Sequence, residues 1–159
     1  MVDIRRVSPA DWPILRRVRL AALADAPSAF GSTYEREIAF TEQEWLGRIK
    51  RSAWFVAWEN DEPIGLAGAF SPSHRPDARE VVSMWVEPGR RGGKLADRLL
   101  ATTMDWARDE GADEVSLWIA DDNERARRFY LRYGFGPTGN RQPLWGHPGV
   151  EAAEYLLAL

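Results

Sequence analysis

The sequence predicts a mixed α/β fold in which one sheet is flanked by helices on both faces. Residues 53–58 and 64–70 are two apolar runs separated by the polar turn 60–63, so we expect an antiparallel hairpin. The stretch from Val81 to Ile119 has the pattern strand, helix, strand, which implies a parallel pair joined by a right-handed crossover. Together these two patterns predict a sheet that contains both kinds of pairing.

The composition indicates one globular domain over residues 1–159. Hydrophobic residues make up 45% of the chain and charged residues 28%, which is ordinary for a folded domain. A formal net charge of -3 gives no basic footprint for nucleic acid. No apolar run approaches the roughly 20 residues that span a bilayer, and the N-terminus has no apolar signal core. We therefore expect a cytoplasmic protein without nucleic-acid or membrane partners.

The chain contains no cysteine, which excludes disulfides, thiolate metal sites and a covalent cysteine thioester. Its two histidines, His74 and His147, are far apart in proline-rich stretches. They are expected to be surface residues, and no metal site is predicted.

Two helices are expected in the N-terminal third. Ser8 and Pro9 suit the cap and first position of one helix, which ends before Pro27. Residues 29–35 are predicted to form a loop, and residues 41–50 a second helix. The first helix carries an apolar stripe of Ile14, Leu15, Val18, Ala21 and Ala22.

The hairpin and three further elements follow. Residues 80–86 are predicted to form a strand, and a helix over about 93–109 comes next and ends at Gly111. Residues 115–119 are predicted to form another strand. The apolar face of the helix consists of Leu95, Leu99, Thr103 and Trp106.

A shorter helix over residues 123–133 and two strands in the tail through 151–157 complete the expected fold. Asp121 and Glu124 are spaced as in a capping box at the start of this helix. Gly134 suits a left-handed stop at its end.

A basic, glycine-containing turn lies between the strand at 80–86 and the next helix. Backbone N–H groups at a helix start, together with the helix dipole, form an anion site. Arg90, Arg91 and Lys94 add positive charge, and Gly92 and Gly93 allow close backbone approach. We expect a phosphorylated ligand here; the alternative is a solvated turn whose glycines serve only its geometry.

A P-loop is disfavoured at this turn. The spacing from Gly89 to Gly93 and Lys94 is one residue too short for the pattern. Leu95 also occupies the position of the hydroxyl residue that would hold magnesium.

The turn resembles the pyrophosphate-binding signature of the GNAT superfamily of N-acetyltransferases, V-x-P-x-x-R-G-x-G-[IV]-[GA]. Lys94 departs from it, because the family usually has glycine there. Residues 123–135 are similar to a second family element, N-x-x-A-x-x-[LF]-Y-x-x-x-G-F, one strand downstream, where the family places it. The matching positions in the turn are Val86, Pro88, Arg91, Gly92, Leu95 and Ala96.

The resemblance implies a mostly antiparallel sheet with one splayed parallel pair, and acetyl-CoA as cosubstrate. Backbone groups of Met84 and Val86 would pair with the pantetheine arm, and N–H groups of the turn would hold the pyrophosphate. Asn123 would contact the pantetheine arm, cap its helix, or do both. The residues assigned to the cofactor are Met84, Trp85, Val86, Arg91, Gly92, Gly93, Lys94, Leu95, Ala96, Asn123 and Tyr130.

The resemblance also implies catalytic roles. Tyr130 matches the family's general acid, which would protonate the departing thiolate; the alternative is a core aromatic. Glu80, on the central strand, is the candidate base, and Glu87 is the second choice, although either acid can equally be a solvated surface residue. Direct transfer in a ternary complex is expected.

In this family the acceptor is approached by the first two helices, their loop and the C-terminal strands. Phe30, Ser32, Thr33 and Glu35 are therefore predicted to form a pocket with an acidic edge, suited to a cationic amine. Alternatively, arginines of the first helix face an anionic group or water, namely Arg16, Arg17 and Arg19. The tryptophans considered for the lining are Trp45, Trp118 and Trp145.

A small-molecule amine is the expected acceptor, and a protein N-terminus or lysine is the second hypothesis. Two competing hypotheses for the activity are the transfer of a different acyl group and a catalytically silent acyl-CoA-binding or regulatory module. A homodimer is also possible.

Overall fold

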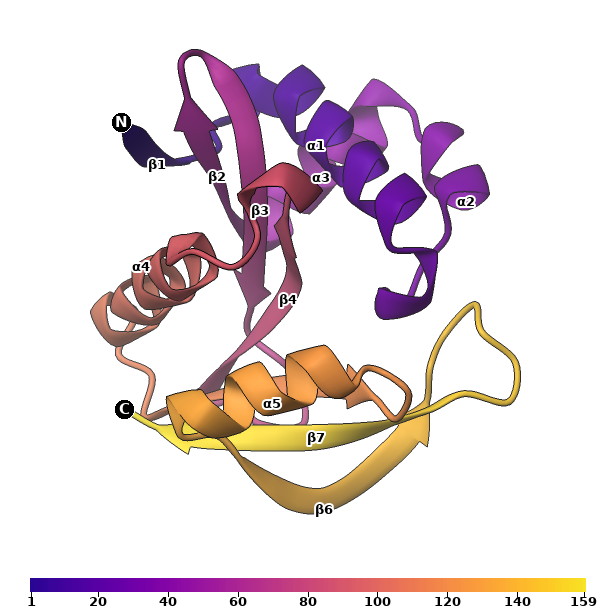
Figure 1. The fold of residues 1–159 in the computed structure, drawn as a ribbon, viewed down its shortest axis with the longest axis vertical. Coiled ribbons are helices and arrows are strands. Elements are labelled where there is room, and N and C mark those ends of the chain that lie inside the picture. The colour runs from indigo at the N-terminus through magenta and orange to yellow at the C-terminus, as the bar shows by residue number, and fades with distance from the viewer.

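The computed structural model describes all 159 residues, and its one sheet has seven strands in the order β1-β2-β3-β4-β5-β7-β6. Neighbouring strands are antiparallel except β4 and β5, which are parallel. The predicted mixed α/β fold with one parallel pair is therefore confirmed (Figure 1). The strands are β1 (Val2–Arg6), β2 (Ala53–Glu59), β3 (Glu62–Phe70), β4 (Ala78–Val86), β5 (Glu114–Ala120), β6 (Gly136–Pro143) and β7 (Glu151–Ala158).

Helices cover both faces of the sheet, as Figure 1 shows for α1 to α3 on one side of β2–β4 and α4 on the other. Leu15 and Trp45 pack against Trp54 on the first face, and Leu95 and Leu99 pack on the second. None of the helices is both long and apolar enough to cross a bilayer. The helices are α1 (Trp12–Asp25), α2 (Tyr34–Ile38), α3 (Glu42–Arg51), α4 (Leu95–Asp109) and α5 (Glu124–Tyr133).

The parallel strands β4 and β5 separate soon after they pair. Their register covers only residues 78–80 of β4 against 114–116 of β5. Further along β4, Ser83 and Met84 together face the single residue Ala67 of β3, and Ser83 has a φ of +60°. A bulge of this kind bends a strand and increases its twist, so β4 turns away from β5. The expected splayed pair is confirmed.

Two elements were not predicted. Residues 2–6 form β1, an edge strand paired antiparallel with β2. The prediction of a loop over residues 29–35 is wrong at its end, because Tyr34 and Glu35 begin the short helix α2. Thr33 is the cap of this helix, and its Oγ1 accepts a hydrogen bond from the backbone N–H of Arg36 at 3.2 Å.

The predicted capping box between Asp121 and Glu124 is wrong. Asn123 caps α5 instead, and its Oδ1 accepts a hydrogen bond from the N–H of Ala126 at 3.2 Å. Asp121 pairs with an arginine of β6, and Glu124 pairs with another arginine on α5. Gly134 has a φ of +117°, so the predicted left-handed stop is confirmed.

A buried ion-pair network ties the three N-terminal helices to the sheet. Glu37 on α2 is fully buried and accepts hydrogen bonds from Nε and Nη2 of Arg19, both at 2.9 Å, and from Nη1 of Arg48 at 2.6 Å. Arg19 also donates to Oγ of Ser83 on the bulge at 2.8 Å. Burial by itself would raise the pKa of Glu37, but the bonds and charge of Arg19, helped by Arg48, lower it to about 2.

Replacing Glu37 with glutamine should lower the free energy of unfolding by about 3 kcal/mol, because the buried guanidinium of Arg19 and the half-buried one of Arg48 lose their counter-charge. Urea unfolding at pH 7 measures this. The control Glu35→Gln changes an exposed residue of the same helix and should stay within about 0.5 kcal/mol of wild type. Since the pKa falls from 4.5 to about 2, the advantage of Glu37 exists above pH 4.5 and should vanish towards pH 2. Equal stability of variant and wild type at pH 7 would contradict this account.

Candidate active site

Two cavities open where β4 and β5 separate. The first, of about 610 Å³, lies between these strands and the N-terminal helices. The second, of about 710 Å³, lies between the β4–α4 turn and α5. Because they share a wall, two bound molecules can meet there. The residues that line both cavities are Ala29, Phe30, Met84, Asn123, Ala126 and Tyr130.

The turn between β4 and α4 presents unused backbone donors to the second cavity. The N–H groups of Gly92 and Gly93, which line this cavity, donate to no protein group. The N–H of Lys94, next to them in the chain, is also unused, and no side chain caps α4. The first N–H groups of a helix lack intrahelical partners, and the dipole is positive at this end. Gly92 has a φ of +88°, a conformation that favours glycine. This arrangement can hold a phosphate group.

Arginines dominate the charge of the second cavity. Five of them line it, against two aspartates. Arg90 and Arg91 are paired with Glu59 and Asp25, so Arg125 and Arg132, which make no ion pair, offer free positive charge to a pyrophosphate. Those on α5 occur at spacings of three and four residues, which places them on one helical face. The arginines are Arg90, Arg91, Arg125, Arg128 and Arg132.

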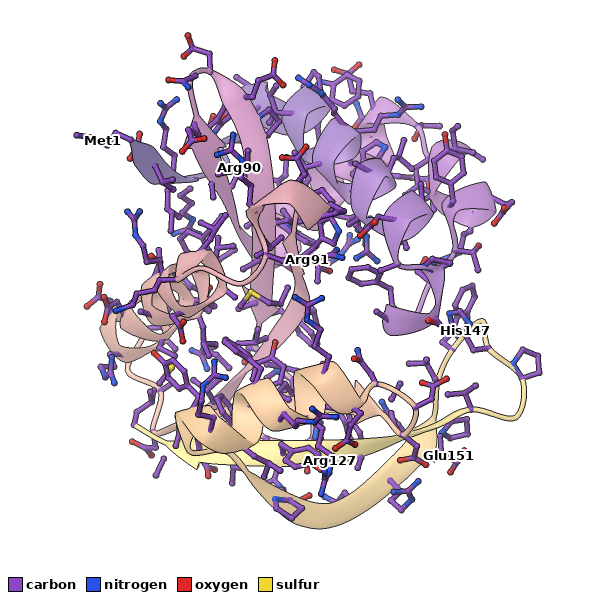
Figure 2. The ribbon with its side chains drawn as sticks, viewed as in Figure 1. Met1, Arg90, Arg91, Arg127, His147 and Glu151 are labelled. Atoms are coloured by element: carbon purple, nitrogen blue, oxygen red, sulfur yellow. The ribbon has the colours of Figure 1, made fainter.

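The side chain of Arg91 braces the turn (Figure 2). Its Nε donates to the carbonyl of Val86 at 2.9 Å, and its Nη2 pairs with Asp25 at the end of α1. The same carboxylate accepts a hydrogen bond from Nε1 of Trp85 at 3.0 Å. The Trp85 bond, together with Arg91, holds the pKa of Asp25 below its ordinary value. Trp85 and Arg91 therefore fix the position of the turn relative to α1.

Lys94, which departs from the family signature, points away from the second cavity. It lines a separate hollow of about 230 Å³ together with Val2, Glu59 and Arg98. Its φ of -102° is ordinary for any residue, so the backbone here does not require glycine. The substitution leaves the donor groups of the turn accessible.

Tyr130 lies on α5 at the shared wall. Its side chain is largely buried in the cluster with Leu117 and Phe135, and burial raises the pKa of its hydroxyl. The hydroxyl oxygen is not among the buried polar atoms left without a partner, and the residue lines both cavities. A phenol in this position keeps its proton at neutral pH and can donate it to a group at the junction.

Glu80 lines the first cavity at the last paired position of β4, opposite Ser116 of β5. Its Oε1 accepts a hydrogen bond from Nε1 of Trp118 at 3.2 Å. Burial raises the pKa of Glu80, although the Trp118 bond and the nearby His74 oppose this. The raised pKa brings this carboxylate closer to neutral pH, as a general base requires. Glu87, in contrast, is exposed and lines neither cavity.

The loop between β6 and β7 borders the first cavity on the side of the N-terminal helices. A ring nitrogen of His147 lies 2.8 Å from the carbonyl oxygen of Phe30, which ties the loop to the segment after α1 (Figure 2). Trp145 of the same loop lines the cavity and stacks on Arg36, with 4.6 Å between the guanidinium carbon and the ring centre. The loop therefore contributes directly to this cavity.

The predicted acceptor residues fall into two groups. Phe30 and Ser32 line the first cavity, whereas Thr33 caps α2 and Glu35 is exposed outside the lining. The charged lining is basic rather than acidic, because Glu80 faces four arginines. Trp118 and Trp145 line the cavity, but Trp45 is fully buried in the core. The arginines are Arg19, Arg36, Arg48 and Arg51.

The chain matches the Acetyltransferase (GNAT) family over residues 18–135, well over half of its length. The chain belongs to the GNAT family of acetyltransferases. The predicted family is thereby confirmed, and both motifs that suggested it fall at the second cavity.

This GNAT protein is 25% identical over 154 residues to an uncharacterized N-acetyltransferase of Archaeoglobus fulgidus, covering 94% of this chain and all of that one. It is 27% identical over 96 residues to one of Methanocaldococcus jannaschii, covering 58% of this chain and 42% of that protein. It thus spans less than half the length of several curated relatives. The yncA protein of Salmonella typhimurium, solved with acetyl-CoA, has the same fold, with a TM-score of 0.76, 20% identity, and coverage of 100% and 94%.

Several charged residues of the GNAT site were not predicted. The α5 arginines 125, 128 and 132 have helical spacing that the sequence alone displays, so periodicity could have placed them on one face. Arg48 and Arg51 are likewise three residues apart on α3. Only the fold, however, brings them together with Arg36 of α2.

Replacing Gly92 with alanine should weaken acetyl-CoA binding by about 5- to 30-fold. A left-handed backbone costs an L-residue roughly 1–2 kcal/mol, so the free turn relaxes to another conformation and binding must restore the left-handed one. Calorimetric titration measures this. Gly89→Ala is the matched control, since its added Cβ meets nothing within 4 Å, its φ lies outside the left-handed region and it lines neither cavity. Equal affinities for the two variants would contradict the role of this backbone conformation.

Proposed function

We propose that this protein is an N-acetyltransferase that moves an acetyl group from acetyl-CoA to the primary amine of a small molecule, by direct transfer while both are bound. One observation carries the proposal: the phosphate-binding turn opens on one cavity, Glu80 lines the other, and Tyr130 lies on the wall between them. Holding two reactants at such a junction supplies much of the rate, since effective molarities can reach about 10⁵–10⁸ M.

The residues of the second cavity fit acetyl-CoA, which supplies an activated thioester. The free N–H groups from Gly92 to Lys94 and the arginines of α5 would bind its pyrophosphate and other phosphates. Backbone groups of Met84 and Val86, on the strand that leaves its neighbour, would pair with the pantetheine arm. Curated relatives called N-acetyltransferases and the acetyl-CoA complex of the yncA protein support this choice.

Two side chains then move protons. An alkylammonium with a pKa near about 10 is mostly protonated at neutral pH, and Glu80 takes its proton directly or through water. As the carbon–nitrogen bond forms and the carbon–sulfur bond breaks, Tyr130 gives its proton to the sulfur. The acetylated nitrogen then gives its extra proton to the phenolate of Tyr130, which restores the phenol. Glu80 releases the proton it took from the ammonium to water.

Titration with acetyl-CoA by calorimetry, followed by measurement of thiol release with a panel of primary amines, tests the proposal. The chain has no cysteine, so a thiol reagent gives no background from the protein. We expect micromolar binding and amine-dependent release, faster than with propionyl-CoA or succinyl-CoA. Binding without release on any amine would support a silent acyl-CoA-binding module. Failure to bind acetyl-CoA would overturn the proposal.

A further inference from the structure

We propose that the acceptor is an amino acid or a similar small zwitterion, and that Arg36, Arg48 and Arg51 bind its anionic group. This inference rests on the proposed function, because it assigns the acceptor of the same site. It differs from the expectation of an acidic pocket for a purely cationic amine.

The first argument is the charge balance of the cavity. Its charged lining consists of four arginines and the single carboxylate of Glu80. Glu37 lies behind the wall and neutralises one charge of the pair Arg19 and Arg48. The cavity therefore retains excess positive charge, which an acceptor with an anionic group would neutralise.

The second argument is that two of these arginines have no carboxylate partner. Arg36 makes one side-chain hydrogen bond, from Nη1 to Oγ of Ser32 at 3.2 Å, and no ion pair. Arg51 makes neither a hydrogen bond nor an ion pair through its side chain, whereas Arg17 on α1 pairs with Glu62 at 2.8 Å. Arg36 and Arg51 therefore leave uncompensated positive charge at the cavity.

The third argument is that aromatic rings orient the guanidinium groups. Arg36 stacks on Phe40 and Trp145, at 5.2 and 4.6 Å from the ring centres. Arg48 lies over Phe40 and Trp54, each at 5.5 Å. A ring over the face of a guanidinium leaves its edges for hydrogen bonds, and Nη1 is the one nitrogen that each of these two side chains uses within the protein. The remaining N–H groups can bind a carboxylate or phosphate.

Repulsion among the arginines of this cavity also favours a bound anion. Burial, together with the charges of Arg19 and Arg36, lowers the pKa of Arg48 despite its ion pair with Glu37. An anion bound among these groups would relieve that repulsion. Meanwhile Glu80, in the same cavity, receives the ammonium end of the acceptor. The arginines therefore match the anionic end of a zwitterion, and Glu80 matches its ammonium end.

The test compares amino acids with their amides, which keep the amine and lose the negative charge. Each compound is titrated into CoA-loaded enzyme by calorimetry and assayed with acetyl-CoA for thiol release. We expect at least one amino acid to bind and react about tenfold or more better than its amide, as charge-assisted hydrogen bonds allow. A series of ω-amino acids of increasing length then measures the distance between the arginines that bind the carboxylate and Glu80, which receives the ammonium.

Arg36→Gln and Arg51→Gln should each raise the KM for the preferred amino acid about tenfold, with little change for its amide and none in the KM for acetyl-CoA. Arg17→Gln, which changes an exposed arginine outside the cavity, should have no effect. If every amide binds as well as its acid, or if the two variants weaken acetyl-CoA instead, the inference is wrong. Failure of acetyl-CoA to bind wild type would instead overturn the proposed function.

Discussion

Tyr130→Phe should lower kcat by about 10²- to 10⁴-fold, the contribution typical of a positioned proton donor, and leave the affinity for acetyl-CoA nearly unchanged. The phenol lies on the wall between the two cavities and keeps its proton at neutral pH because burial raises its pKa. Phenylalanine preserves the packing against Leu117 and Phe135, so the variant loses the hydroxyl and little else. Steady-state kinetics and calorimetry with acetyl-CoA measure the two quantities.

Tyr133→Phe is the matched control for this substitution. Tyr133 lies on the same helix and packs against the same hydrophobic cluster, but it lines neither cavity. Removal of its hydroxyl should leave kcat within about twofold of wild type, since this hydroxyl lies outside both cavities. If the two variants lose activity equally, Tyr130 is a packing residue and another group protonates the sulfur.

Glu80→Gln should lower kcat/KM by about 10²- to 10⁴-fold at neutral pH, because the amide cannot take a proton from the ammonium. In wild type, activity requires ionised Glu80, so it should rise with pH and level off above the raised pKa of this carboxyl. In the variant, only free amine reacts, so the rate should keep rising towards the amine's own pKa. The gap between the two enzymes should therefore narrow at high pH.

Stability separates this effect from unfolding. Glutamine still accepts the hydrogen bond from Trp118, and it removes a charge that burial disfavours. The free energy of unfolding of Glu80→Gln at pH 7 should therefore equal or exceed that of wild type. Parallel pH profiles for variant and wild type would exclude Glu80 as the base and assign the role of proton acceptor to a bound water.

The elements that could be predicted from the sequence are those with strong local signals. The β2–β3 hairpin and the crossover through α4 follow from apolar runs, turn residues and helical periodicity. The strand β1 was not predicted, because Val2 and Ile4 are its only apolar residues and the rest are charged. Such a short pattern does not indicate a strand, and the pairing with β2 is visible only in the fold. The helix α2 has only five residues, and the burial of its second carboxylate, Glu37, depends on two arginines that are distant in the sequence.

The same distinction applies to the site. The basic turn and Tyr130 each belong to a motif that is continuous in the sequence, and the structure brings both to the second cavity. The first cavity combines Arg36 of α2, Arg48 of α3 and Trp145 of the last loop, which no local pattern connects. An acidic edge was expected from Glu35 as part of a loop. Residues 34–38 form the helix α2 instead, and Glu35 lies outside the cavity lining.

The short pairing of β4 with β5 affects how strongly the stability of the protein depends on its ligand. Each half has its own hydrophobic cluster, one around Trp45 and one around Val115, and the strands between them share only three residue pairs. A ligand lying along that gap joins the halves, and at one hundred times its Kd it adds about 2.7 kcal/mol to the free energy of unfolding. Protease sensitivity of the purified protein should therefore fall as acetyl-CoA is added.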